Sequence, residues 1–393
     1  MQNVKIERTN GNVVKRLPGQ DHISGLLVYL TSFPSNPAWG EGHNINPCSS
    51  IEQAEALGIT TTDPTKWEIC MLHYHLSEVY RINPGVTLYV GVFTTPANGT
   101  YTFSEVKAMQ NYAEGSMRQL GVWAGRKDLT AVDLTALQGM ADTLSAADRP
   151  MSIIYAPKIG SVADLPVNLA GENKCNVSVL IGQDGGGIAA ELHKKYAVIA
   201  KMSITAIGTV LGIISKARVH QSIASVSDFP SGISLPAFGD GTELRTLDRA
   251  IVDKLDDARY LFFVNYDGLA GTYLNDSHTM DSATSDYSMI ENVRTMDKAV
   301  RGIRRALLPK LGGALYVTPE TGQLAPYEVE YLQTIANKPL EDMRKAGELS
   351  GVSVIIDPSQ NVLQTSEVVI VIKQVGVGVL RRIKCKIGFA TSL

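Results

Sequence analysis

The sequence predicts an α/β (α+β) protein in which helices cover a mixed sheet core and both chain ends are extended β-segments. Three observations indicate this fold. Short apolar runs alternate with helical segments, residues 375–389 near the C-terminus alternate in polarity with a period of two, and the N-terminal residues do so over a shorter stretch. With 393 residues, of which 44% are hydrophobic and 19% charged, the chain can bury a substantial core in one large or two medium domains.

The amino-acid composition restricts the kinds of partner and ligand that we expect for the chain. The net charge is −3, which does not support a general electrostatic attraction to nucleic acid or to an anionic membrane, so we expect no nucleic acid partner. The four cysteines are far apart and include no C-x-x-C pair, a pattern that indicates neither a zinc site nor a disulfide framework. The first residues lack the apolar core of a secretion signal, and we expect no export by that route.

Residues 1–20 are predicted to form an N-terminal linker arm. Val4 and Ile6 alternate with Lys5 and Glu7, which is the pattern of a short strand with one apolar face. The apolar segment 23–30 follows and is the first candidate for a buried strand. The arm is therefore expected to pair with another molecule.

Strand and helix patterns then alternate along the middle of the chain. Strands are expected at 86–93, 151–155, 177–181 and 260–264, with a short apolar segment at 121–124. Helices are expected at 104–120, where Ser104 is the cap, and at 134–144, 188–200 and 247–255. This alternation predicts a sheet with helices on its faces.

The one long apolar run is residues 196–215. It contains Lys201 and several Ser, Thr and Gly residues, and no aromatic belt flanks it. Its length fits either a membrane span or a buried helix, alone or followed by a strand. The composition favours a buried element, and we expect no membrane insertion.

The region after Tyr266 begins with a polar, acidic segment and continues as an amphipathic helix. Its basic positions are spaced four, three and four apart, so they share one face; they are Arg294, Lys298, Arg301 and Arg305. One interpretation is that this basic face is simply exposed to solvent. The other is that it forms a docking stripe for an acidic partner. A second helix, 327–345 with a kink at Pro339, leads to strands at 352–356 and 368–372.

Residues 375–393 are predicted to form a C-terminal linker strand. Apart from Arg381, one face is apolar and carries Val375, Val377, Val379, Ile383, Cys385, Ile387 and Phe389. The alternating stretch would be roughly 50 Å long, whereas strands in globular domains usually have about five or six residues. It is either an edge strand of its own domain, with basic residues that discourage pairing, or a strand lent to a neighbour. The matching N-terminal arm favours the second.

Catalytic and ligand-binding patterns are weak, and we expect no catalytic, cofactor or metal site. The loop 183–187 lies between a strand and a helix but lacks the Lys-Ser/Thr of a P-loop and the spacing of a dinucleotide fingerprint. His73 and His75 lie in a helical segment, where residues two apart do not share a face. Asp276, Asp281 and Asp286 fit neither a calcium loop nor a helix face and are expected to be solvated loop residues.

The C-terminal third resembles a known family. The order of residues that carries the likeness is Asp267-Gly268, Gly271-Thr272-Tyr273, Asn275-Asp276, Asp286-Tyr287 and the helix 293–305, followed by a second helix, a strand pair and an alternating strand. It resembles the C-terminal half of contractile tail sheath proteins, which form the sleeve of myophage tails, R-type tailocins and related injection systems. The likeness covers about 260–393, is weaker over the N-terminal arm and 25–29, and is limited to general α/β character over 96–250.

The resemblance implies an assembly function without a cofactor. It implies a conserved core at 21–95 and 251–374, an outer variable domain at 96–250, and terminal arms that complete the sheets of neighbouring subunits. The implied partners are further copies of the chain in a helical polymer, an inner tail tube, and baseplate and terminator proteins. The implied location is a virion tail or similar particle, made and assembled in the bacterial cytoplasm. The tube would face either the basic stripe or the helix 327–345.

Two other classes remain open at this point. Another phage tail protein, such as a baseplate or terminator component, would also donate strands but would form closed rings. A nucleotide-binding α/β enzyme would have to use the loop 183–187.

Overall fold

A computed structural model of the chain describes residues 20–61 and 66–389. Its body is built on a six-stranded sheet with the strand order β2-β3-β1-β4-β5-β6. Strand β2 pairs antiparallel with β3, and the other neighbours are parallel. The strands are β1 (Ser24–Leu30), β2 (Ile45–Cys48), β3 (Leu88–Thr94), β4 (Gln119–Asp128), β5 (Ser152–Lys158) and β6 (Val177–Val179).

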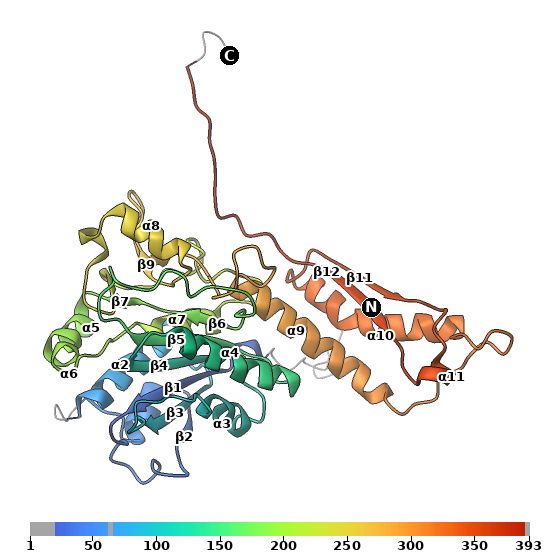
Figure 1. Ribbon diagram of the computed structural model, residues 1–393, viewed down its shortest axis with the longest axis horizontal. Helices are drawn as coiled ribbons and strands as arrows, with labels where there is room; N and C mark the ends of the chain where they lie inside the picture. The colour runs from blue at the N-terminus through green and yellow to red at the C-terminus, as the bar shows by residue number, and fades with distance from the viewer. Residues whose placement is uncertain (1–19, 62–65, 390–393) are drawn as a thin grey trace, which may run out of the picture.

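Helices cover both faces of this sheet (Figure 1). Alternate residues of β1 enter the two cores: Leu26 and Val28 pack with α2 (Trp67–Ile82) and α7 (Ile207–Lys216), whereas Leu27 and Tyr29 pack with α3 (Glu105–Tyr112) and α4 (Ala131–Ala146). All seven residues of β1 are buried, as expected for a central parallel strand covered on both sides. The predicted α/β class is confirmed.

Shorter elements complete the body. Helix α1 (Ile51–Ala56) follows β2, and Ser50 caps it by accepting a hydrogen bond from the Gln53 amide. The remaining elements are β7 (Gly182–Asp184), β8 (Pro236–Phe238), α8 (Arg249–Asp257), β9 (Phe263–Val264) and β10 (Tyr273–Leu274). Leu261 continues the parallel order by bridging to Leu180, beyond β6.

The apolar run 196–215 is divided among several elements. The chain passes from α5 (Gly187–Leu192) through a π-helical turn (His193–Ala197) and α6 (Val198–Ala200) to α7. Lys201 adopts a left-handed conformation between α6 and α7, and α7 is buried in the body core. Within 20–61 and 66–389, no helix is both long enough and apolar enough to cross a membrane.

A second unit follows the body. Helix α9 (Ile290–Leu307) leads from the body to a layer formed by α10 (Pro326–Lys345) and the strands β11 (Gly351–Ile356) and β12 (Ile370–Val375), with the short α11 (Val362–Thr365) between the strands (Figure 1). Gly302 of α9 meets Pro339 of α10, and a Cβ at Gly302 would lie 3.0 Å from the proline Cβ. The two helices therefore cross closely at the proline predicted to kink α10.

Two sequence-based boundaries need correction. Strand β1 pairs with β3 on one side and β4 on the other, so the expected core segment 21–95 and outer segment 96–250 share one sheet. Residues 251–262 also pack in the body, through Leu255, Tyr260 and Phe262. In addition, the helix expected at 104–120 ends at Tyr112, because Glu114 and Gly115 adopt positive φ before β4 begins.

Candidate assembly interface

The strands β11 and β12 form a small antiparallel sheet, with pairing from Gly351 opposite Val375 to Ile356 opposite Ile370. Alternate side chains such as Val354 and Ile372 pack on α9 and α10, whereas Ile355 and Val371 on the other face are exposed. Within the described chain this sheet has two strands. The outer edge of each strand therefore presents backbone N–H and C=O groups that pair with no other strand of the described chain. An added strand from another molecule can form hydrogen bonds to such groups.

The C-terminal segment is not one strand from Val375 onward. Strand β12 ends at Val375, and residues 376–389 join no sheet within the described chain. The ladder stops there because β11 begins at Gly351, opposite Val375, and no further residue of β11 remains to pair. Figure 1 shows that the segment then runs past the start of α9 and projects away from the molecule.

The predicted apolar face of this segment is also interrupted. Val375 lies on the exposed outer face of the small sheet, whereas Val377 and Val379 are half-buried against the molecule. Beyond them Ile383, Cys385, Ile387 and Phe389 are exposed. Residues that the sequence alternation places on one face thus differ in their burial.

Arg381 fastens this segment to the body. Its Nε donates to both carboxylate oxygens of Asp276, at 3.0 Å each, and its Nη2 donates to Glu291 Oε1 at 2.5 Å. The Glu291 side chain is only 3% exposed, so the ion pair is formed at a largely desolvated carboxylate at the start of α9. The residue that breaks the apolar pattern in the sequence is therefore the one that anchors the segment.

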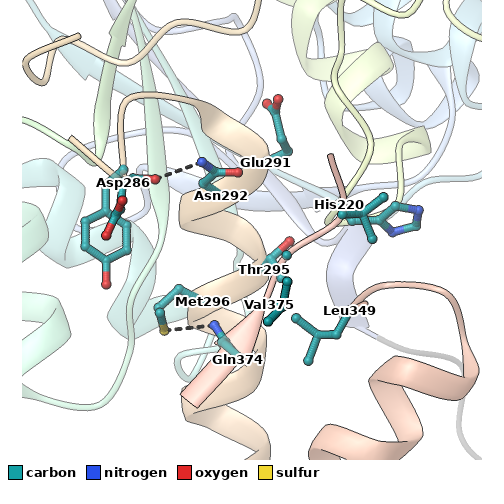
Figure 2. A pocket seen from close by; sticks show the side chains of 12 residues that line it. His220, Asp286, Glu291, Asn292, Thr295, Met296, Leu349, Gln374 and Val375 are labelled. Atoms are coloured by element: carbon teal, nitrogen blue, oxygen red, sulfur yellow. Dashed lines mark hydrogen bonds between the residues drawn. The ribbon is translucent and has the colours of Figure 1, made fainter. Parts of the chain in front are cut away.

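A groove of about 390 Å³ lies between the first turns of α9 and the end of β12. Figure 2 shows Thr295 and Met296 on one side and Gln374 and Val375 on the other, with Gln374 Nε2 donating to Met296 Sδ at 3.3 Å. Gly376 and Val377 also line this groove. The start of the C-terminal segment therefore borders an open groove before Arg381 reaches the body.

The N-terminal arm can be followed only at its end. Val4 and Ile6 lie outside the described residues. Asp21, just after the arm, pairs with Lys298 at 2.7 Å and with Arg301 at 3.3 Å. Burial alone would raise the pKa of Asp21, but the hydrogen bond from Lys298 and the nearby positive charges outweigh it and lower the pKa below its ordinary value.

The predicted basic stripe on α9 is mostly turned into the molecule. Arg294 is 3% exposed and donates to the backbone oxygens of Ala217 at 3.1 Å and Arg218 at 3.4 Å. Lys298 pairs with Asp21 and Glu348, Arg301 pairs with Asp21, and Arg305 is exposed. The expectation of an exposed stripe is corrected for Arg294, Lys298 and Arg301, because their partners are brought in from distant parts of the chain.

The other candidate helix has a free face. On α10, Tyr327, Glu330, Tyr331, Thr334 and Lys338 are exposed, while Leu332, Ala336 and Leu340 are buried against the second unit. This face is available to a partner.

The weak ligand-binding patterns are occupied by internal contacts. In the loop 183–187, Asp184 accepts hydrogen bonds from the Gly186 and Leu235 amides and from the Ser234 hydroxyl. A carboxylate at the centre of this loop opposes phosphate binding. His73 contacts Glu55, and His75 is fully buried beside Trp123.

The acidic loop residues are likewise used within the fold. Asp276 pairs with Arg381, Asp281 accepts from the Ser282 amide and the Ser285 hydroxyl, and the Asp286 backbone oxygen accepts from Asn292. Asp276 and Asp281 are thus structural rather than solvated. No cluster of three His, Cys, Asp or Glu side chains suited to a metal occurs in the described part of the chain.

Comparison with family models covers nearly the whole chain. Residues 1–278 match the model described as "DUF2586, N-terminal domain", and residues 286–393 match "DUF2586, C-terminal domain". The chain belongs to the DUF2586 family. The boundary between the two family models, at 278–286, lies just before α9 and so coincides with the passage from the body to the second unit.

A phage protein is similar in sequence to part of this DUF2586 chain. A Haemophilus phage HP1 protein named "Putative tail sheath protein" is 28% identical over 193 residues, which are 49% of this chain and 45% of that protein. The chain thus matches less than half the length of this relative.

Two solved structures resemble the DUF2586 chain over almost its full length. The helical sheath of the anti-feeding prophage in its contracted state has a TM-score of 0.63 and 16% identity, with 98% of this chain and 99% of that chain covered. The contracted PVC sheath complex of an extracellular contractile injection system has a TM-score of 0.60 and 12% identity, with 99% of each chain covered. The fold is that of these contractile sheath subunits.

Proposed function

We propose that this chain is the structural subunit of a contractile sheath. In this proposal it polymerises into a helical sleeve around an inner tube, and contraction of the sleeve drives the tube through a target envelope. The observation that carries the proposal is the pairing of an unfilled sheet edge with an unpaired segment: β11 and β12 have open outer edges, and 382–389 is extended, exposed and alternates apolar and polar side chains. The full-length likeness in fold and the name of the phage relative support it.

The assembly mechanism follows from strand addition. The C-terminal segment of one subunit, and in the same way its N-terminal arm with Val4 and Ile6, adds a strand to the β11–β12 sheet of a neighbour. Because donor and acceptor are different surfaces, each contact leaves one free donor and one free acceptor. Such head-to-tail contacts propagate as a helical polymer when they do not close into a ring.

Contraction needs no bound nucleotide in this proposal. Subunits move as rigid bodies between two packings while the donated strands keep them connected. A free-energy difference of a few kcal/mol per subunit, of the order common in two-state protein equilibria, would add up over many coupled subunits. The proposed function is accordingly non-enzymatic and uses no cofactor.

The proposed partners are copies of this chain, an inner tail tube, and baseplate and terminator proteins at the ends of the sleeve. For the tube we favour the exposed face of α10 that contains Tyr327, Tyr331 and Lys338, since Arg294, Lys298 and Arg301 are engaged within the subunit. The proposed location is a virion tail or a related particle, assembled in the bacterial cytoplasm.

Negative-stain electron microscopy of the purified full-length chain tests this function. Long hollow tubes with a cogwheel cross-section are the expected result. Single closed rings would point instead to a terminator or baseplate component. Dispersed monomers at high protein concentration would contradict both forms of assembly.

A further inference from the structure

Resting on the proposed sheath function, we infer that Arg381 divides the C-terminal segment into a part that the parent subunit keeps, 376–381, and a part that it donates, from Arg382 onward. Arg381 is thus a positioning residue: it fixes where the donated strand leaves the parent. The boundary differs from the one at Val375 that the sequence alternation suggests.

Several polar contacts with the body hold the Arg381 side chain in place. Its guanidinium bridges two elements, reaching Asp276 and Ser277 on the loop after β10 and Glu291 on the first turn of α9. Glu291 also accepts a hydrogen bond from the Ser277 hydroxyl at 2.5 Å, so its carboxylate is held in place. An arginine that binds a desolvated carboxylate and a second carboxylate together is held far more firmly than an exposed single pair.

Burial decreases close to the same residue, where the neighbouring Leu380 is already 76% exposed. Before it, Val377 and Val379 are half-buried against the molecule. After it, every residue from Arg382 to Phe389 is exposed, and Ile387 and Phe389 are fully exposed. In the described chain, Arg382, Lys384 and Lys386 form no ion pair, in contrast to Arg381.

The length of the free part fits its proposed use. Twelve residues, 382–393, span roughly 40 Å when extended, whereas the six residues of β11 or β12 span roughly 20 Å. The free part can therefore pair along a whole acceptor strand and still leave residues to bridge the gap between subunits. Its alternation supplies Ile383, Cys385 and Ile387 to one face, as a strand packed on helices requires.

Distance measurement by pulsed electron paramagnetic resonance tests the anchor on the monomeric fraction of the full-length protein. One spin label is placed in the retained part through Leu380→Cys, an exposed position next to Arg381, and the other on α8 through Lys254→Cys. Cys175→Ser and Cys385→Ser remove the half-buried and the exposed native thiols, and Cys48 and Cys70 are buried. We expect a narrow distance distribution in this background. Arg381→Gln should broaden it at least twofold, and Arg381→Lys should recover part of the narrow distribution.

Arg382→Gln is the matched control, because it removes the same charge from the adjacent residue and should leave the distribution unchanged. Asp276→Asn weakens the same anchor from the body side and should also broaden the distribution, which keeps the test decisive if Arg381→Gln folds poorly. Equal widths for the parent, Arg381→Gln and Asp276→Asn would overturn the inference.

Assembly provides a second, separable readout. The double variant Ile383→Ser/Ile387→Ser should keep the melting temperature of the monomer and lose tubes in negative stain. The matched pair Val377→Ser/Val379→Ser should lower the melting temperature, because these side chains pack on the parent. The reverse pattern would overturn the assigned boundary. If even the unmodified chain forms no tubes, the sheath function fails while the distance measurement still decides the role of Arg381.

Discussion

At the residue scale, the basic side chains of α9 show how one residue type serves different roles according to its surroundings. Arg294 and Arg305 lie on the same predicted face of the helix, yet Arg294 is buried and bonded to three backbone oxygens while Arg305 is exposed. Burial lowers the pKa of Arg294 to about 10, which leaves the guanidinium charged at neutral pH. The hydrogen bonds to the backbone oxygens replace the water that burial removes from the charged guanidinium.

We predict that Arg294→Ala lowers the free energy of unfolding by about 3 kcal/mol, because it leaves the backbone oxygens of Ala217 and Arg218 without their buried donor. Arg305→Ala, which removes the same side chain from an exposed position of the same helix, should change stability by less than about 0.5 kcal/mol. Urea denaturation of both variants measures the difference. Similar losses in the two would show that the contacts of Arg294 contribute little.

His75 predicts a pH dependence of stability. It is fully buried, its ring nitrogens have no hydrogen-bond partner in the described chain, and burial lowers its pKa to about 3 from the ordinary 6.5. Between these two values the unfolded chain binds a proton that the folded chain does not. The free energy of unfolding therefore falls as the pH decreases from 6.5 towards 3, by up to about 1.4 kcal/mol per pH unit.

We expect His75→Leu to remove this contribution, so that the variant loses about 2 to 3 kcal/mol less than the parent between pH 6.5 and pH 4.5. Urea denaturation at both pH values gives the comparison. His43→Leu, at an exposed position, is the control and should follow the parent. Equal acid sensitivity of the parent and His75→Leu would argue against a buried neutral imidazole.

At the element scale, close helix packing fixes the arrangement of the body. Gly208 of α7 faces the backbone of α2, where a Cβ would lie 2.0 Å from the His75 backbone oxygen. Gly212, one turn later, similarly faces Ile82. These two glycines allow α7 to cross α2 at a distance that a larger side chain would prevent.

Gly208→Ala is expected to cost about 3 kcal/mol or to prevent folding, because a backbone oxygen cannot move aside as a flexible side chain can. Gly139→Ala in α4 makes the same change in a helix where nothing lies within 4 Å of the added Cβ. It should raise stability by about 0.5 to 1 kcal/mol through helix propensity. Thermal melting of the two variants tests this contrast, and a neutral Gly208→Ala would mean that the helices can separate at little cost.

At the scale of the whole molecule, α9 connects both chain ends to the body. Its first turn holds the C-terminal segment through Glu291 and Arg381, and its middle holds Asp21, just after the predicted N-terminal arm, through Lys298 and Arg301. In the contact with Arg381 the helix contributes the acidic residue, whereas in the contacts with Asp21 the helix contributes the basic residues. A load applied to either donated strand in an assembly would therefore reach the same helix.

We predict that a chain ending at Arg381, and separately a chain lacking residues 1–8, folds as a soluble subunit but forms no tubes. Each deletion removes a strand proposed to complete a neighbour's sheet and leaves the described cores intact. Thermal melting checks the fold and negative stain checks the assembly. A loss of cooperative unfolding in either truncated chain would instead place that segment in the parent core.

Much of the architecture could be predicted from local pattern. The strands at 151–155 and 177–181, the helix at 134–144, and the two C-terminal helices all correspond to observed elements, because burial on one or two faces leaves a periodic trace in the sequence. The sheet shared across the predicted boundary between residues 95 and 96 could not be predicted, since the pairing of β1 with both β3 and β4 is a long-range contact with no local signature.

The sequence by itself determined the α/β class, the amphipathic character of α9 and the two-residue alternation of the C-terminal segment, all of which follow from the spacing of apolar residues. Only the tertiary structure decided which side chains remain free. Arg294, Lys298 and Arg301 turn inward because Asp21, Glu348 and the Ala217 carbonyl meet them in space, and Arg381 becomes an anchor because Asp276 and Glu291 converge on it. Ion pairs between residues far apart in the chain depend on the folded arrangement, which the order of charges along a helix does not contain.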